Sequence, residues 1–214
     1  MREDMDYPAV AGPDVANTES EGLQRWQHAG RWFRYGEHAV FSRIGGEGEA
    51  LLLLHGFPSA SWDWHRLWPA LTARYRVMVA DMLGFGFSDK PQDYPYSIID
   101  QADLQQGWLE EMGVERVHIL AHDYGATVAQ KLLARDQQGE LPFSVASVCL
   151  LNGAIFPEVH LSGQPMLSRY RELIGEQAIM SLPGIGHYPH VEVPGEVLQR
   201  YLRFRDAIPP QKPE

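Results

Sequence analysis

Residues 116–130, RVHILAHDYGATVAQ, form the stretch that decides the fold. A short apolar run, Val117–Ala121, is followed by a polar apex at Asp123 and then by apolar residues at helical spacing. This order predicts a buried strand, a sharp turn and a helix, and the small residues Gly125 and Ala126 allow the helix to begin close behind the turn. Such a turn presents one side chain above the sheet at a helix N-terminus, which favours the ionised form of an acid. We therefore expect Asp123 to be a nucleophile.

Apolar runs on both sides of this stretch predict the remaining strands of one sheet. The strand candidates are residues 31–35, 39–44, 50–54, 76–80, 145–151 and 177–182. Amphipathic stretches with helical spacing separate several of them. The helix candidates are residues 64–71, 97–113 and 197–204. Strands that alternate with helices predict right-handed βαβ units, and hence an α/β fold with a mostly parallel sheet and helices on both faces.

Polar or glycine-rich loops follow the carboxyl ends of these strands, where sites gather in parallel sheets. The loops are HGFP (55–58), DMLGFGFSD (81–89), HDYGA (122–126), NGAIFPE (152–158) and GIGHYPH (184–190). The second loop opens with Asp81, which we expect to accept hydrogen bonds from loop N–H groups. His122 is expected to pack beside the sharp turn.

The composition bounds the class of protein. The chain has 214 residues, 44% of them hydrophobic, so it can bury the core of one domain. A net charge of −10 and the lack of a Lys/Arg run argue against a nucleic-acid-binding surface. The longest apolar run, Ala50–Leu54, is too short to cross a bilayer, so no transmembrane segment is expected.

The N-terminal residues 1–24 are polar and lack periodicity, so we expect an arm there and one domain over 25–214. The charged N-terminus has no apolar region of the kind that signal peptides contain. Cys149 is the single cysteine and lies in an apolar run, where an inert thiol is expected. We expect a cytoplasmic location and no cofactor.

Taken in order, these loops resemble the α/β-hydrolase fold family. The likeness covers roughly residues 25–160 and 180–205. It is carried by HGFPSASWDWHRLWPAL (55–71), ADMLGFGFSDKP (80–91), LAHDYGATVAQ (120–130) and GIGHYPHVEVP (184–194). An aspartate at the sharp turn resembles the branch that contains epoxide hydrolases and haloalkane dehalogenases. The HDYG, IFPE and HYP stretches resemble the mesoderm-specific transcript group within it.

The resemblance implies that Asp123 is the nucleophile and His187 the base. In such a reaction a carboxylate attacks an electrophilic carbon and forms an enzyme ester, which histidine-activated water then cleaves. The oxyanion of the second step needs fixed donors. The resemblance assigns this oxyanion hole to the backbone N–H groups of Phe57 and Tyr124.

A metal site at the histidine loop is not expected. The loop contains His187 and His190, and Glu192 follows shortly after it. Pro189 interrupts the ligand spacing, and no third histidine follows.

The acid that orients the histidine in this family has no clear counterpart here. There is no aspartate between Asp136 and Asp206. Two substitutes are Asn152, after the sixth-strand candidate, and Glu158 in the loop that follows. An amide can orient an imidazole without stabilising its charge, and amide-for-acid replacement in the serine triad costs on the order of 10⁴ in kcat.

The multi-helix cap of the family has little room in this chain. Only residues 159–186 lie between Glu158 and His187, so we expect 159–176 to be a reduced cap remnant. A third alternative to the two substitute acids is therefore a shortened isoform, fragment or engineered minimal form with little activity. A sheet that lacks the last crossover leaves an apolar gap or a surface for a homodimer.

The expected function is hydrolysis of a small apolar substrate, epoxide- or ester-like, through an aspartyl ester. One alternative is a weak or inactive hydrolase-like protein that acts by binding or assembly. A haloalkane dehalogenase is disfavoured: Tyr124 replaces the tryptophan expected for halide binding, and Phe57 replaces a frequent asparagine. A serine esterase is disfavoured because Ser88 lies in a glycine loop rather than at a sharp turn.

Overall fold

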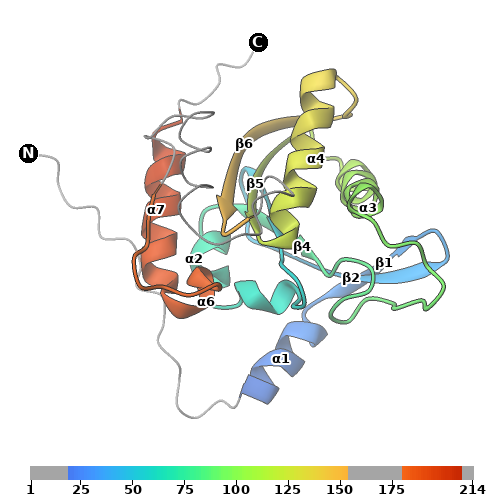
Figure 1. Ribbon diagram of the computed structural model, residues 1–214, viewed down its shortest axis with the longest axis horizontal. Coiled ribbons are helices and arrows are strands. Elements are labelled where there is room, and N and C mark those ends of the chain that lie inside the picture. Colours follow the sequence, from blue (N-terminus) through green and yellow to red (C-terminus); the bar gives the residue numbers. More distant parts are fainter. Residues whose placement is uncertain (1–18, 154–179, 209–214) are drawn as a thin grey trace, which may run out of the picture.

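The computed structural model describes residues 19–153 and 180–208, and within this part a six-stranded sheet forms the centre of the molecule (Figure 1). The strands are β1 (Arg31–Tyr35), β2 (His38–Gly45), β3 (Ala50–Leu54), β4 (Arg76–Ala80), β5 (Arg116–His122) and β6 (Ser144–Leu151). Their order across the sheet is β1-β2-β4-β3-β5-β6; β2 pairs antiparallel with both β1 and β4, and β4, β3, β5 and β6 pair in parallel. Six of the seven predicted strands, the one over residues 117–121 included, are confirmed to within one or two residues.

Helices cover both faces of the sheet, as the α/β pattern predicted (Figure 1). The helices are α1 (Glu19–His28), the 3₁₀ helix η1 (Ser61–Trp64), α2 (Trp68–Thr72), α3 (Ile98–Glu111), α4 (Tyr124–Gln138), α6 (Pro189–Glu192) and α7 (Pro194–Asp206). α3 and α4 pack on one face through residues such as Leu104 and Leu132, whereas α1, η1, α2 and α7 share a second core on the other.

The two cores follow from the alternation of side chains along buried parallel strands. In β3, Leu52 and Leu54 face the α3–α4 side, and Leu51 and Leu53 face the α7 side. All four leucines are fully buried. The parallel pairing places the carboxyl ends of β3, β4, β5 and β6 along one edge of the sheet, where the loops 55–58, 81–89 and 122–126 begin.

The predicted continuous helix over residues 64–71 is wrong in one respect. The chain forms η1, a turn, and then α2, because Pro69 lacks an N–H and is accepted only in the first turn of a helix. The apolar face was nevertheless predicted correctly, since Trp64, Leu67 and Trp68 are all buried.

The predicted strand over residues 177–182 is not observed in its described part. Residues 180–182 are irregular and lead into a turn in which Ile185 N–H donates to the Leu182 carbonyl at 3.4 Å. Pro183 and Gly184 favour this turn. Residues 177–179, and the expected cap remnant over 159–176, lie outside the described residues.

The expected end of the N-terminal arm at residue 24 is also wrong, because α1 begins at Glu19. Trp26 anchors this helix and is only 2% exposed. Its indole N–H donates to the Ser61 hydroxyl at 3.1 Å, and the Arg43 guanidinium lies 4.1 Å from its ring. The sequence pattern missed α1 because one large side chain, rather than an apolar stripe, attaches it to the domain.

We predict that Trp26→Ala destabilises the domain by about 3–5 kcal/mol, the usual cost of removing a buried aromatic side chain. Leu23→Ala on the same helix is the control, since Leu23 is 37% exposed and its removal should cost less than about 1 kcal/mol. Urea unfolding of both variants measures the difference. Equal stabilities would show that α1 is not part of the folded domain.

Candidate active site

The loop between β5 and α4 holds Asp123 in a backbone conformation that few residues adopt. Its φ is 47° and its ψ is −114°, outside the main allowed regions for an L-residue. The main chain is fixed on both sides, because Asp123 N–H donates to the Leu151 carbonyl at 3.1 Å and its own carbonyl accepts from Ala126 N–H at 2.9 Å. The result is the sharp strand-to-helix turn predicted from the sequence.

Two glycines make this turn possible. A Cβ on Gly125 would lie 2.6 Å from the carbonyl oxygens of Leu54 and His55, so a side chain there would collide with the main chain after β3. A Cβ on Gly56 would lie 2.8 Å from the Cβ of Asp123. The loop after β3 therefore contacts the turn directly, and this contact brings a backbone donor to the carboxylate.

That donor is the backbone N–H of Phe57, which lies 2.8 Å from Asp123 Oδ1. The loop carrying it is held by His55, whose Nε2 accepts from Met82 N–H at 2.9 Å and whose Nδ1 lies 2.9 Å from the Gly56 carbonyl. Burial lowers the pKa of His55, so the ring is neutral, with its one proton on Nδ1. The predicted oxyanion donor at Phe57 thus faces the predicted nucleophile.

The imidazole of His187 approaches Asp123 from the other side. Its Nε2 lies 3.2 Å from Asp123 Oδ2, and its side chain is 49% exposed. The two carboxylate oxygens therefore have different partners, a backbone N–H on Oδ1 and a histidine on Oδ2. The sequence predicted this pairing of Asp123 with His187, although 63 residues separate them along the chain.

The histidine loop is fixed mainly through its backbone. His122 Nε2 lies 2.8 Å from the His187 carbonyl, and because a carbonyl can only accept, this nitrogen carries the proton. Glu192, from α6, accepts hydrogen bonds from Gly186 N–H at 2.8 Å and from Tyr188 N–H at 3.0 Å. The loop thus has a defined main-chain path although the imidazole itself reaches solvent.

Asn152 lies beside His187 but does not orient its ring in the way the sequence suggested. Its amide nitrogen donates to the main-chain carbonyls of Gly186, at 3.2 Å, and His187, at 3.0 Å. Within the described residues, the only carboxylate recorded within 4 Å of a His187 ring nitrogen is that of Asp123. Glu158, the other candidate acid, lies outside the described residues.

The remaining predicted donor, Tyr124, is the first residue of α4, so its N–H has no acceptor within the helix. Its role in an oxyanion hole stays a prediction. Its ring and two others form an aromatic wall beside Asp123, with ring centroids 5.9 Å apart for Phe85 and Tyr124 and 6.1 Å apart for Phe57 and Phe85. Phe57 is 61% exposed, so this wall is open to a ligand.

Sequence reasoning missed the positioning residues of this site. Glu192 was considered only as a metal ligand, yet its carboxylate accepts the N–H of Tyr188, the residue before α6, much as the glutamate of a capping box does. An acid a few residues after a helix start was the available signal. Asp81 behaves as expected, accepting from the N–H groups of Ser61 and Phe87, each at 2.7 Å.

We predict opposite effects for two glycine-to-alanine substitutions. Gly125→Ala should destabilise the protein by about 1–3 kcal/mol or more, because the collision outweighs the better helix propensity of alanine. Gly107→Ala, in α3 with open space around its Cβ position, should instead stabilise by about 0.5–1 kcal/mol. Urea unfolding measures both. Stabilisation by Gly125→Ala would contradict the close contact between the turn and the β3 loop.

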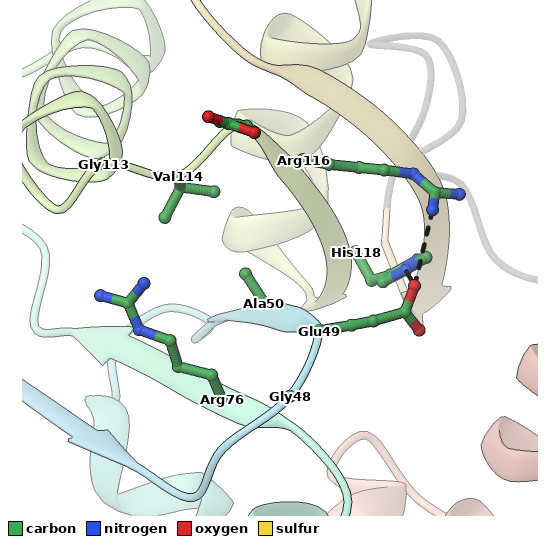
Figure 2. Close-up of a pocket in the computed structure, with 9 residues that line it drawn as sticks. Gly48, Glu49, Ala50, Arg76, Gly113, Val114, Arg116 and His118 are labelled. Carbon is green, nitrogen blue, oxygen red and sulfur yellow. Dashed lines mark hydrogen bonds and ion pairs between the residues drawn. The ribbon is translucent and has the colours of Figure 1, made fainter. Parts of the chain in front are cut away.

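Two shallow hollows in the described surface lie at the other end of the sheet, where the parallel strands begin. Figure 2 shows one of about 300 Å³, in which Glu49 points toward Arg116 and His118. The Glu49 carboxylate, just before β3, lies 3.5 Å from the Arg116 guanidinium and 3.5 Å from the His118 ring, both of which belong to β5. These hollows contain none of the residues that surround Asp123.

The strained acidic turn, the backbone donor and the facing histidine together define an α/β-hydrolase type of site. Residues 49–173 match the family described as alpha/beta hydrolase fold, and the chain belongs to this family. None of the described helices is long and apolar enough to span a membrane.

Two curated proteins are similar to this chain over about three quarters of its length. The chain is 40% identical over 170 residues to the mesoderm-specific transcript protein of Mus musculus, covering 76% of this chain and 49% of that protein. It is 39% identical over 160 residues to the putative hydrolase LipZ of Mycobacterium tuberculosis, covering 74% and 55% respectively. The chain thus spans about half the length of the curated relatives it matches.

A solved structure supports the fold. The crystal structure of an alpha/beta hydrolase fold protein from Burkholderia ambifaria has 31% sequence identity and a TM-score of 0.53, covering 80% of this chain and 57% of that one. The family resemblance expected from the loops is therefore confirmed.

Proposed function

We propose that this chain carries the catalytic site of a hydrolase that uses Asp123 as nucleophile and His187 as base. The observation that carries the proposal is the asymmetric contact of the carboxylate, with Phe57 N–H 2.8 Å from Oδ1 and His187 Nε2 3.2 Å from Oδ2. A carboxylate that only capped α4 would accept from N–H groups of its own helix, but Asp123 makes no side-chain cap hydrogen bond.

The first step uses Oδ2, the carboxylate oxygen on the His187 side, which has no backbone N–H donor among the described residues. This oxygen attacks an electrophilic carbon of the substrate, and the bond from that carbon to its leaving oxygen breaks with its electron pair. From an epoxide an alkyl ester of Asp123 results, whereas attack on the acyl carbon of an ester expels its alkoxide or phenoxide and leaves a mixed acyl anhydride on Asp123. For an epoxide the leaving oxygen stays attached to the product and takes up a proton from water.

The second step uses the other oxygen. His187 takes a proton from water, and the hydroxide attacks Asp123 Cγ. Oδ1 then carries the negative charge of the tetrahedral intermediate, and Phe57 N–H already lies at hydrogen-bond distance from it. Collapse releases the alcohol, which leaves with the proton from His187, and the oxygen from water remains in the carboxylate.

The aromatic wall supports a small apolar substrate. Phe57, Phe85 and Tyr124 border the nucleophile, and such side chains contribute large apolar contact areas. Serine chemistry is not supported at Ser88, which is 2% exposed and whose hydroxyl donates to the Asp81 carbonyl at 2.6 Å. Dehalogenation remains a lesser alternative on the sequence grounds given above.

A second candidate function is binding or assembly by a hydrolase-like protein with little turnover. It is favoured by the lack, among the described residues, of an acid beside His187 other than Asp123 itself. Without an orienting acid the imidazolium of the second step loses its electrostatic support. Both candidates predict the same folded site but different outcomes with substrate.

The experiment that tests the proposal is a single turnover in ¹⁸O-water with styrene oxide as the epoxide and p-nitrophenyl butyrate as the ester. One ¹⁸O should appear in the peptide containing Asp123, because the water oxygen stays in the carboxylate. Asp123→Asn should lower the rate on the order of 10⁴-fold or more, as expected when a nucleophile is removed.

The control is Asp93→Asn, at an exposed loop position, which should retain wild-type rates. Product with an unlabelled Asp123 peptide would exclude the aspartyl-ester mechanism. No product and no label with either probe would favour the binding candidate.

A further inference from the structure

A second group of side chains lies buried next to the Asp123–His187 pair. Asp63 of η1, His122 at the end of β5 and His190 of α6 each offer one ligand atom, and these atoms lie within 4.8 Å of one another. His122 and His190 are both fully buried. Three elements that are distant in sequence thus place two imidazoles and a carboxylate around one point.

Three of the four imidazole nitrogens of this group lack a hydrogen-bond partner in the described part of the chain. Neither nitrogen of His190 has a partner, and His122 Nδ1 has none. Buried polar atoms in native proteins are nearly always satisfied, so each exception calls for an explanation such as an ion or an ordered water. A species bound between the rings would satisfy one nitrogen of each, His122 Nδ1 and one of the two on His190.

The protonation of His122 defines what that species must be. Its Nε2 carries the proton, because it donates to the His187 carbonyl at 2.8 Å. Its Nδ1 therefore carries a bare lone pair and is the nitrogen left to bind a ligand. A histidine that donates one N–H to a backbone carbonyl and offers the other nitrogen is the usual arrangement of a metal ligand.

The other two members are similarly held. Trp64 stacks on His190, with ring centroids 4.5 Å apart and planes 27° apart, which fixes the ring orientation. The Ser59 hydroxyl donates to Asp63 Oδ2, leaving the second carboxylate oxygen for another partner. Two histidines and one carboxylate are a common ligand set for zinc and related divalent ions.

We propose that Asp63, His122 and His190 bind one divalent transition-metal ion of the zinc type. The ion would link η1, β5 and α6 next to the histidine loop. Because it would hold three elements together, its role would be structural. His122 links it to the active site, because the same ring holds the His187 carbonyl. This site differs from the grouping of His187, His190 and Glu192 that the sequence argued against, since the Glu192 carboxylate is occupied by backbone N–H groups.

The test begins with the full chain freed of metal by a chelator and then titrated with Zn²⁺. We expect saturable binding of one ion per chain and a rise in Tm, because an ion that binds the folded state stabilises it. Co²⁺ should bind the same site and give a visible absorption band typical of tetrahedral nitrogen and oxygen ligation.

Variants locate the site. His190→Gln and Asp63→Asn should each abolish stoichiometric binding, whereas His38→Gln, on the β1–β2 hairpin, should leave it unchanged. Where a variant fails to fold, ¹⁵N NMR of the wild-type imidazoles decides, since Zn²⁺ should shift His122 Nδ1 and not its Nε2.

The absence of one-to-one binding to the wild-type chain would overturn the proposal and leave an ordered water as the bound species. Undiminished binding in both folded variants would overturn it as well. Neither outcome depends on catalysis, so the metal site and the aspartyl-ester mechanism stand or fall separately.

Discussion

The main-chain conformation of Asp123 is the constraint on which the rest of the site depends. Its φ of 47° turns the chain from β5 into α4 within one residue, so the carboxylate points away from the helix it precedes. The turn also needs Gly56 and Gly125, because a Cβ at either would collide with neighbouring atoms. Backbone strain of this kind is kept where the surrounding structure enforces it, and such positions are concentrated at functional sites.

The histidine side of the site is built differently. His187 lies on a loop whose backbone accepts hydrogen bonds from the side chains of His122 and Asn152 and donates one to the carboxylate of Glu192. These contacts place the Cα of His187 opposite the carboxylate, and the distance of 3.2 Å between Nε2 and Oδ2 completes the arrangement. The proposed nucleophile is thus positioned by the strained turn and the proposed base by loop contacts. Changes to either group would disturb one half of the reaction more than the other.

The sequence was informative where local chemistry decides the structure. The buried strands, the sharp turn at Asp123 and the start of α3 after Ser97 all follow from short patterns. Ser97 Oγ accepts from Asp100 N–H at 3.1 Å, as the hydroxyl of an N-cap serine does.

Less could be predicted where one long-range contact decides. α1 is attached to the domain through Trp26, and no periodic sequence pattern predicts that contact. Asn152 was expected near His187 and lies there. An amide can bind either a histidine ring or a backbone carbonyl, however, and which one it binds depends on the conformation of the histidine loop, which short sequence patterns do not predict. The group of Asp63, His122 and His190 could not be predicted from the sequence either, because its members come from three separate elements.

The central claim is that Asp123 forms the covalent bond and His187 acts only afterwards. The most direct test is the intact mass of His187→Gln incubated with styrene oxide. The account predicts that the ester forms but is not hydrolysed, so the protein gains the mass of one substrate molecule and peptide mapping places it on Asp123. An unmodified His187→Gln protein, under conditions in which the wild type turns styrene oxide over, would contradict the account.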